Sequence, residues 1–380
     1  MDGAPPADMR IVSARLRDFR TYARAEARLG PGLTVVHGPN GAGKSNLLES
    51  LYYGCTARSP RTRNERELIR FGADAARVVV KVADGSQEHE LSVGFGAYAA
   101  GERPAKRMTA DGAPVERLLD LEQRPLLSVF MPDRLELLKG APTLRRAHLD
   151  QFVAAIWPAR AHARREYSQV LAQRNALLSG IRAGRASAET LSTWDRELAA
   201  RALALRGLRA DAVALLATPF AERAAQLGCS GAASLEYRPR SRAADVEAFV
   251  AELEQRLPRD LERGFSGHGP HRDELAVLRD GRGLRVYGSQ GEQRLALLAL
   301  LLAERDVLAT ECRRMPIMLL DDVMSELDAD RRELLARELS VGGQSVIATT
   351  DLGHVPGAGE AAVARLRVSP GAILQEALAA

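Results

Sequence analysis

The chain has 380 residues, a net charge of +4 and a hydrophobic content of 46%, of which little is aromatic. This length favours two domains over one. The three cysteines, Cys55, Cys229 and Cys312, are far apart and form no C-x-x-C pair, which argues against a disulfide framework and fits the reducing cytoplasm. The longest strongly apolar stretch, Leu295 to Ala303, is too short to span a membrane. The arginine-rich positive charge favours a polyanionic partner.

Residues 38–45 follow a short apolar run, Leu33 to Val36, and fit the phosphate-loop pattern G-x-x-x-x-G-K-[ST] at every fixed position. The expected ATP-binding residues are Gly38, Pro39, Asn40, Gly41, Ala42, Gly43, Lys44 and Ser45. Backbone N–H groups and the dipole of the following helix would face the phosphates. Lys44 would reach the β- and γ-phosphates and Ser45 would hold Mg²⁺. A plain glycine turn would explain the glycines but not the Lys-Ser pair.

An arginine cluster follows the first helix, formed by Arg58, Arg61, Arg63, Arg66 and Arg70. Because few aromatic residues lie near it, the cluster is suited to sequence-independent contacts with the phosphates of duplex DNA. The alternative is that these arginines are solvated or paired with Glu65 and Glu67.

Apolar residues alternate from Arg77 to Gly112, and Asp84-Gly85 and Asp111-Gly112 are typical hairpin turns. The pattern predicts an antiparallel sheet, which segments 11–17 and 22–29 would join.

From about Thr143 to Leu216 the periodicity is helical. A first helix would end at Ser179-Gly180. A second would follow a heptad seam, interrupted by Arg201, with the members Leu191, Trp194, Leu198, Leu205, Leu208, Ala212 and Leu215. The pattern predicts an antiparallel helical hairpin, either a protruding stalk or a helix pair packed on the core.

Two further motifs lie near the C-terminus. Ser289-x-Gly291 opens an apolar helix, and such a helix start is an anion site. Residues 316–322 read as a buried parallel strand ending in Asp321 and Asp322. Asp321 is suited to holding Mg²⁺ through water and Asp322 to orienting the attacking water. The span between Lys44 and Asp321 exceeds what one compact core uses, so a domain has been inserted between them.

Residues 287–294 resemble the signature motif of ATP-binding-cassette (ABC) ATPases, and residues 325–328 resemble their D-loop. The resemblance implies that Ser289, Gly291 and Glu292 complete the ATP site of a second subunit. It implies that Ser325 and Asp328 are the D-loop residues, and that ATP joins two copies of the chain into a head-to-tail homodimer.

Four passages are similar to those of the RecF family of bacterial recombination and repair proteins, and the similarity runs from about Met9 to Val368. The passages are residues 16–22, 132–140, 269–275 and 319–328. The resemblance implies an α/β fold: a phosphate-loop ABC-type ATPase head with an antiparallel β subdomain and an inserted helical domain. The expected boundaries are 1–142 and 256–380 for the two parts of the head and 143–255 for the insertion. It also implies DNA binding and cooperation with RecO and RecR in loading RecA at gapped DNA.

Some positions depart from related ATPases. Asp322 stands where transporters and most SMC proteins carry Glu, which predicts a slow ATPase. DNA that stabilises the closed dimer is expected to stimulate it. Gln123 lies too early for a Q-loop, whose turn is occupied by Pro132-Asp133, and Thr350-Asp351 stand where a switch histidine is expected. The alternative function is a transporter-type or other ATP-driven motor subunit that acts on a protein complex. The helical insertion and the paired aspartates favour the DNA-repair ATPase.

Overall fold

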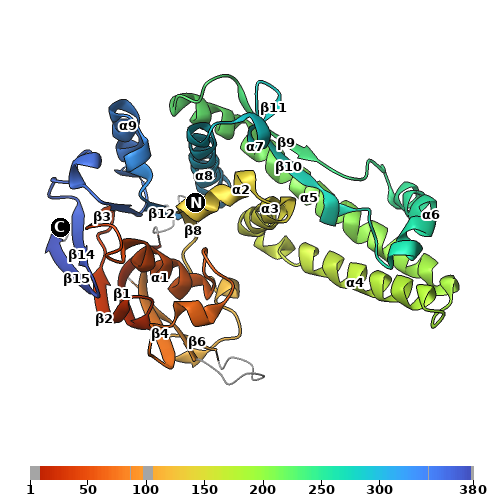
Figure 1. Cartoon of the computed structure of the whole chain (residues 1–380), viewed down its shortest axis with the longest axis horizontal. Coiled ribbons are helices and arrows are strands. Elements are labelled where there is room, and N and C mark those ends of the chain that lie inside the picture. The colour runs from red at the N-terminus through yellow and green to blue at the C-terminus, as the bar shows by residue number, and fades with distance from the viewer. Residues whose placement is uncertain (1–8, 86, 97–105, 341, 378–380) are drawn as a thin grey trace, which may run out of the picture. The chain divides into compact units, whose positions relative to one another are not determined.

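The computed structural model describes residues 9–85, 87–96, 106–340 and 342–377 (Figure 1). The chain divides into two compact units. Residues Met1–Arg134 and Leu308–Ala380 form the first, which we call the head unit, and Leu135–Val307 form the second, the helical unit. These bounds differ from the predicted insertion at 143–255. Residues 256–307 cluster with the helical unit because strands on either side of the predicted boundary pair with one another.

The head unit contains a six-stranded, mostly parallel sheet with the order β15-β14-β3-β13-β12-β8. Its strands are β3 (Leu33–His37), β8 (Leu127–Phe130), β12 (Ile317–Asp321), β13 (Ser345–Thr349), β14 (Ala364–Ser369) and β15 (Ala372–Ala377). Strand β12 is buried along its whole length and pairs in parallel with β13 and β8, so the predicted acidic strand is confirmed. The carboxyl ends of β3, β13, β12 and β8 therefore meet at one edge of the sheet.

The second sheet of the head unit is antiparallel, with the order β2-β1-β4-β5-β6-β7. Its strands are β1 (Arg10–Phe19), β2 (Tyr22–Arg28), β4 (Ala75–Asp84), β5 (Gln87–Gly96), β6 (Arg107–Ala110) and β7 (Ala113–Pro114). Both predicted hairpins are confirmed. Alternate side chains, such as Val78, Val80 and Leu91, enter a core shared with the helix α1 (Lys44–Thr56). The other face of this sheet carries polar side chains.

The remaining helices are α2 (Glu136–Lys139), α3 (Pro142–Ile156), α4 (Ala163–Arg182), α5 (Leu191–Gln226), α6 (Val246–Arg263), α7 (Leu284–Tyr287), α8 (Gln290–Cys312) and α9 (Ala329–Ser340). Short 3₁₀ turns are η1 (Glu65–Leu68), η2 (Leu118–Asp120), η3 (Pro132–Leu135), η4 (Pro158–Arg160), η5 (Ala188–Thr190), η6 (Pro270–Arg272), η7 (Val323–Glu326) and η8 (Leu352–His354). Within the helical unit, α4, α5 and α6 pack together beside a small sheet of β11 (Arg282–Gly283), β10 (Glu274–Arg279) and β9 (Ala233–Arg238) (Figure 1). None of the helices within the described ranges is both long enough and apolar enough to cross a bilayer.

The predicted helix end at Ser179-Gly180 is wrong, because α4 continues to Arg182. A glycine inside a helix costs only about 1 kcal/mol relative to alanine, which helix packing offsets. Two residues beyond the end of the helix stands Gly184, whose φ of 67° is left-handed. The N–H groups of Gly184 and Arg185 donate to the carbonyls of Ile181 and Gly180, the pattern of a Schellman cap.

The predicted apolar seam of α5 is only partly confirmed. Five predicted members are buried, whereas Trp194 and Leu215 are only partly covered; the buried ones are Leu191, Leu198, Leu205, Leu208 and Ala212. Arg201 is exposed beside Glu197. Two charged residues, Asp195 and Arg209, also occupy the buried face. Asp195 accepts a hydrogen bond from the fully buried Arg174 of α4 at 2.5 Å. Charges in the seam are tolerated because each has a partner of opposite sign.

Candidate nucleotide-binding site and basic sheet surface

The phosphate loop joins β3 to α1, and its backbone requires glycine at two positions. Gly38 has a φ of 155° and Gly43 a φ of 117°. A Cβ at Gly38 would lie 2.2 Å from the carbonyl oxygen of Val368, and a Cβ at Gly43 would lie 2.8 Å from the hydroxyl of Tyr22. No side chain fits at either position. The loop is therefore held open with its N–H groups at the start of a helix, where phosphate binds.

Residues at the turn between β1 and β2 hold this loop through hydrogen bonds. The hydroxyl of Tyr22 donates to the carbonyl of Gly43 at 2.9 Å, and Asn46 of α1 donates to the hydroxyl of Thr21 at 3.1 Å. Burial raises the pKa of Tyr22, which keeps its hydroxyl protonated as a donor. These contacts explain why the passage 16–22, far from the loop's own pattern, belongs to the site.

Lys44 lies buried above the loop. Its ammonium donates to the carbonyls of Gly38 and Pro39 at 2.8 and 3.0 Å. Burial lowers the pKa of Lys44, while the charges of Asp322 and Asp321 oppose that shift. The carbonyls hold the cation at the mouth of the loop, where it can exchange them for phosphate oxygens in a stronger, charge-assisted contact.

Asp321 and Ser45 lie together at the end of β12 and the start of α1. The carboxylate of Asp321 is 6% exposed and accepts a hydrogen bond from Ser45. Burial raises its pKa, and Ser45, Arg61 and Lys44 lower it. A hydroxyl beside a carboxylate is a donor set that Mg²⁺ uses, so these residues fit the expected cation.

Asp322 has a left-handed backbone with a φ of 52°. Its N–H donates to the carbonyl of Ala348 on β13 at 2.9 Å, and its own carbonyl accepts from the hydroxyl of Ser325. Its Oδ1 is buried and has no hydrogen-bond partner among the described residues. An orphaned carboxylate oxygen is costly, and such an atom suits a group that must accept a proton or hold a water when nucleotide is bound.

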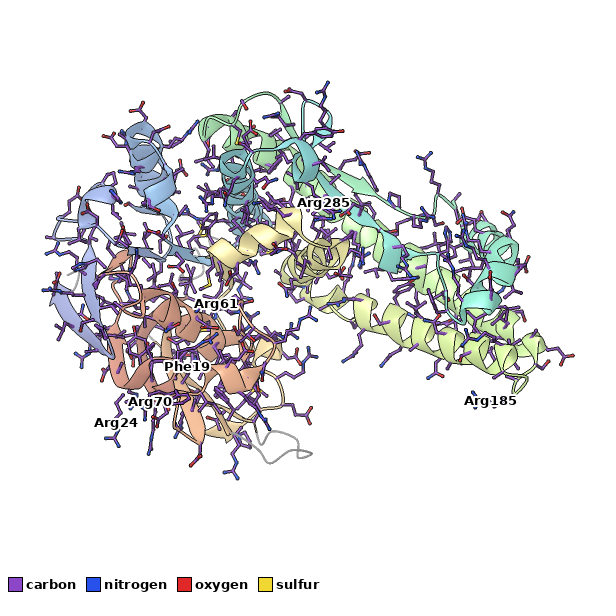
Figure 2. All side chains as sticks on the ribbon, in the orientation of Figure 1. Phe19, Arg24, Arg61, Arg70, Arg185 and Arg285 are labelled. Carbon is purple, nitrogen blue, oxygen red and sulfur yellow. The ribbon has the colours of Figure 1, made fainter. Side chains whose placement is uncertain are left out.

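Arg61 contacts acidic residues beside the nucleotide site, although it remains exposed. Its guanidinium donates to Asn46 and Glu49 of α1 at 3.0 and 3.2 Å and is 3.6 Å from a carboxylate oxygen of Asp133. The fully buried Glu49 also accepts two hydrogen bonds from Arg20, each at 2.8 Å. Arg61 is labelled in Figure 2.

The other members of the predicted cluster are divided as well. Arg70 donates to Asp18 at 2.8 Å, whereas Arg58, Arg63 and Arg66 are exposed. Glu65 contacts Lys106 and the hydroxyl of Tyr53. Because Arg61 and Arg70 contact carboxylates, the cluster has less unpaired positive charge than its sequence suggests.

Two positions without an assigned role also lie at the carboxyl edge of the parallel sheet. Pro132-Asp133 follow β8, the neighbour of β12. Asp351 follows β13 and accepts a hydrogen bond from the N–H of Gly353 in η8. His354, which belongs to none of the sequence motifs, lies with its Nε2 4.0 Å from a carboxylate oxygen of Asp351.

The signature residues begin α8 in the helical unit. Ser289 and Glu292 form a capping box: the N–H of Ser289 donates to Glu292 at 2.8 Å and the N–H of Glu292 donates to the Ser289 hydroxyl at 3.3 Å. Glu292 also contacts Arg279 and Ser230, and the N–H of Ser289 holds its pKa low. Glu292 is therefore engaged within its own chain, while Ser289 and Gly291 are exposed.

Two apolar side chains at the start of this motif, Val286 and Tyr287, are exposed. Val286 is 74% and Tyr287 64% exposed, although side chains of this size are usually covered. The D-loop residues are exposed in part: Asp328 caps α9 by accepting from the N–H of Arg331 at 3.0 Å.

The outer face of the antiparallel sheet carries a row of arginines that no local pattern predicts. Register places Arg17 of β1 opposite both Arg24 of β2 and Arg77 of β4. The row continues through Gly94 of β5 to Arg107 of β6. We call Arg24, Arg17, Arg77 and Arg107 the arginine row. Arg24 extends away from the sheet in Figure 2.

All four members of the arginine row are exposed, and none forms an ion pair with another described residue. The adjacent row differs, since Arg15 pairs with Glu90 at 2.7 Å. Like charges directly opposite each other destabilise a sheet. The face of the sheet therefore matches a polyanion.

Comparison with known proteins identifies the family. A family model described as the RecF/RecN/SMC N-terminal domain matches residues 10–364. The DNA replication and repair protein RecF of Heliobacterium modesticaldum is 36% identical over 351 residues, covering 90% of this chain and 92% of the relative. That of Anaeromyxobacter sp. is 38% identical over 357 residues, covering 90% and 93%. The chain belongs to the RecF family.

Solved structures agree with this assignment. A structure described as the recombination mediator protein RecF with ATP has a TM-score of 0.85 and 26% identity, covering 99% of this chain and 100% of the other. The Smc head domain of Pyrococcus furiosus has a TM-score of 0.56 at 16% identity, covering 96% of this chain and 95% of the other. The second likeness shows the fold alone: the ABC-type ATPase head that RecF and SMC proteins share.

Proposed function

We propose that this RecF family member is an ATP-dependent DNA-binding ATPase of recombinational repair. The proposal rests chiefly on one observation: the chain has both a folded phosphate loop, in the head unit, and an exposed signature motif, in the helical unit. In the ABC superfamily these are the two halves of a shared ATP site. The named relatives are replication and repair proteins, and RecF structures are described with ATP.

In the proposed site, the residues of the phosphate loop, 38–45, bind the triphosphate of ATP. Lys44 leaves the carbonyls of Gly38 and Pro39 to contact the β- and γ-phosphates. Ser45 holds Mg²⁺ through its hydroxyl and Asp321 holds it through water. When bound, Mg²⁺ neutralises phosphate charge.

Asp322 orients the attacking water with its unpaired Oδ1 and accepts its proton. The aspartate side chain is one methylene shorter than the glutamate of transporters, and a misplacement of about 1 Å can lower a rate roughly a hundredfold. We therefore expect slow hydrolysis. The proposed role of Arg61 is to hold Asn46 and Glu49 in place and to add positive charge beside Asp321.

ATP would join two copies of the chain, with Ser289 and Gly291 of one copy completing the site of the other. Glu292 acts indirectly, by fixing the start of α8. The exposed Val286 and Tyr287 beside the signature would be covered by the second copy. Ser325 and Asp328 would lie at the same interface.

DNA is the proposed polyanionic partner, and the arginine row is its proposed contact on the head unit. Arg58, Arg63 and Arg66 are a secondary candidate because they are exposed. Arg61 and Arg70 contact carboxylates. DNA bound across two copies would favour the closed dimer and stimulate hydrolysis. We further propose that the protein acts with RecO and RecR in RecA loading at gapped DNA, in the cytoplasm.

Steady-state ATPase activity with and without single-stranded, duplex and gapped DNA tests the proposal. Stimulation of a slow basal rate by DNA supports it. An ATPase indifferent to every DNA would favour the alternative, a motor subunit that acts on a protein complex.

A further inference from the structure

A hollow of about 320 Å³ opens on the helical unit, and its lining includes no residue of the signature sequence. It is lined by Arg240, Arg263, Gly267 and Arg272. Arg263 ends α6, Arg272 ends η6, and Arg240 follows β9. Three segments distant in sequence thus bring three guanidinium groups to one place.

None of these three arginines forms a side-chain ion pair with another residue that the structure describes. Two buried carboxylates next to these segments, Asp273 and Asp260, already accept other hydrogen bonds. Asp273 accepts from the hydroxyl of Tyr237 and from the backbone N–H of Arg240. Asp260 accepts from Arg174 and from the N–H of Gly267. The charge of the hollow is therefore left for an external anion.

The loop that carries Arg272 is firmly held. Arg209 donates to the carbonyl of Pro270 at 2.7 Å, and Arg146 donates to that of Asp273 at 2.8 Å. His271 lies between the hydroxyl of Tyr167 at 2.6 Å and the carbonyl of Ser266 at 3.0 Å. Since a carbonyl only accepts, Nε2 of His271 carries the proton and Nδ1 accepts from Tyr167. Arg272 is thus presented from a backbone that needs little ordering on binding.

An aromatic ring stands beside the arginines. Phe265 is 40% exposed, and the guanidinium of Arg272 is 5.9 Å from the centre of its ring. Gly267 lines the hollow with its backbone. Arginines beside an exposed aromatic ring suit a strand whose bases are unpaired, because phosphates bind the cations while a base stacks on the ring.

We propose that this hollow binds the phosphodiester backbone of single-stranded DNA, with a neighbouring base stacked on Phe265. The inference deepens the proposed DNA-binding function and rests on it. It gives single strands a site on the helical unit, whereas the arginine row belongs to the head unit.

The test uses the full chain and fluorescence anisotropy with a labelled oligodeoxythymidylate and, separately, a labelled duplex. The triple variant R240E/R263E/R272E should bind the single strand at least tenfold more weakly. The slope of the logarithm of its binding constant against the logarithm of salt concentration should become shallower by about 0.7 for each phosphate that the variant no longer neutralises. Phe265→Ala should weaken single-strand binding roughly five- to 150-fold. Duplex affinity and ATP affinity should change little in both variants.

Arg185→Glu is the matched control, because Arg185 is an exposed arginine of the same unit that does not line the hollow. If the triple variant and Phe265→Ala both bind single-stranded DNA as tightly as the wild type, the inference is overturned. A selective loss of duplex binding in these variants would also overturn it. Phe265→Ala keeps the test informative if the triple variant does not fold. Wild-type protein that binds neither DNA would instead contradict the proposed function itself.

Discussion

The hydroxyl of Tyr22 lies 2.9 Å from the carbonyl oxygen of Gly43 and links the first β-hairpin to the last turn of the phosphate loop. Tyr22 is fully buried, and the position of Gly43 leaves no room for a Cβ between them. The loop is thus shaped partly by a residue outside its own pattern.

Replacing Tyr22 by phenylalanine should reduce the free energy of unfolding by about 1 kcal/mol or more, because the carbonyl of Gly43 loses a buried donor. ATP affinity should fall several-fold as the loop relaxes. Thermal denaturation with and without ATP measures both effects. Tyr52→Phe, on the neighbouring helix α1 but only partly buried, is the control, and an equal loss in both variants would contradict this role of Tyr22.

Lys44→Ala should lower ATP affinity at least tenfold. The substitution removes the cation beside the loop but leaves its backbone in place, and a charge-assisted hydrogen bond contributes about 1.5–3 kcal/mol. Calorimetric titration with ATP and Mg²⁺ measures the change. Lys139→Ala, a lysine at the end of α2, serves as control. Unchanged affinity in the Lys44 variant would refute the assignment of the site.

Ser289→Arg should abolish the ATP-dependent dimer but leave ATP binding by the monomer intact. An arginine at the exposed start of α8 would block the approach of a second subunit and its bound phosphate. Light scattering at saturating ATP gives the molecular mass. Ser234→Arg, at an exposed position of β9, should still dimerise. A wild-type chain that stays monomeric in ATP would rule out the shared site.

The triple variant R17E/R24E/R77E should bind duplex DNA more weakly at every sequence tested. The slope of the logarithm of its binding constant against the logarithm of salt concentration should become shallower by about 0.9 for each phosphate that the arginine row no longer neutralises. A variant with the same charge change at Arg196, Arg201 and Arg337, each of which already has an acidic partner, is the control. Equal reductions in affinity in both variants would mean that only net charge matters.

Local patterns predicted the parts of this molecule that depend on short stretches of chain. The phosphate loop, the strand ending at Asp321 and the hairpin at Asp84 are each specified by a few neighbouring residues. The pairing of β9 with β10 was missed because their partners are separated by α6. A glycine at position 180 was read as a helix end, although packing and the cap at Gly184 carry the helix past it.

In the candidate site, too, features set by neighbouring residues were predicted and features set by tertiary contacts were not. Lys44 and Ser45 lie where their motif placed them, next to Asp321 from the far end of the chain. The arginine row depends on register between strands, which composition does not reveal. Arg61 was grouped with its sequence neighbours, but tertiary contacts with Glu49 and Asp133 decide its role.

Asp322→Asn should trap the ATP-bound dimer on DNA. The amide keeps the size of the side chain but cannot accept the proton of the attacking water, so hydrolysis should stop. ATP binding should persist, because Lys44, Ser45 and Asp321 are unchanged. If hydrolysis times release, the dimer of the variant should remain on DNA far longer than the wild type.

The deciding measurement is the dissociation rate from DNA in ATP, followed after addition of excess unlabelled DNA. A double variant with Lys44→Ala, assayed at an ATP concentration that it no longer binds well, is the control and should lose the long lifetime. Equal dissociation rates for wild type and Asp322→Asn, alongside abolished turnover, would mean that hydrolysis does not time release. If the variant dissociates slowly in ATP but at the wild-type rate in ADP, release depends on the γ-phosphate. It would then depend on the contact that Ser289 of the second copy is proposed to make with that phosphate.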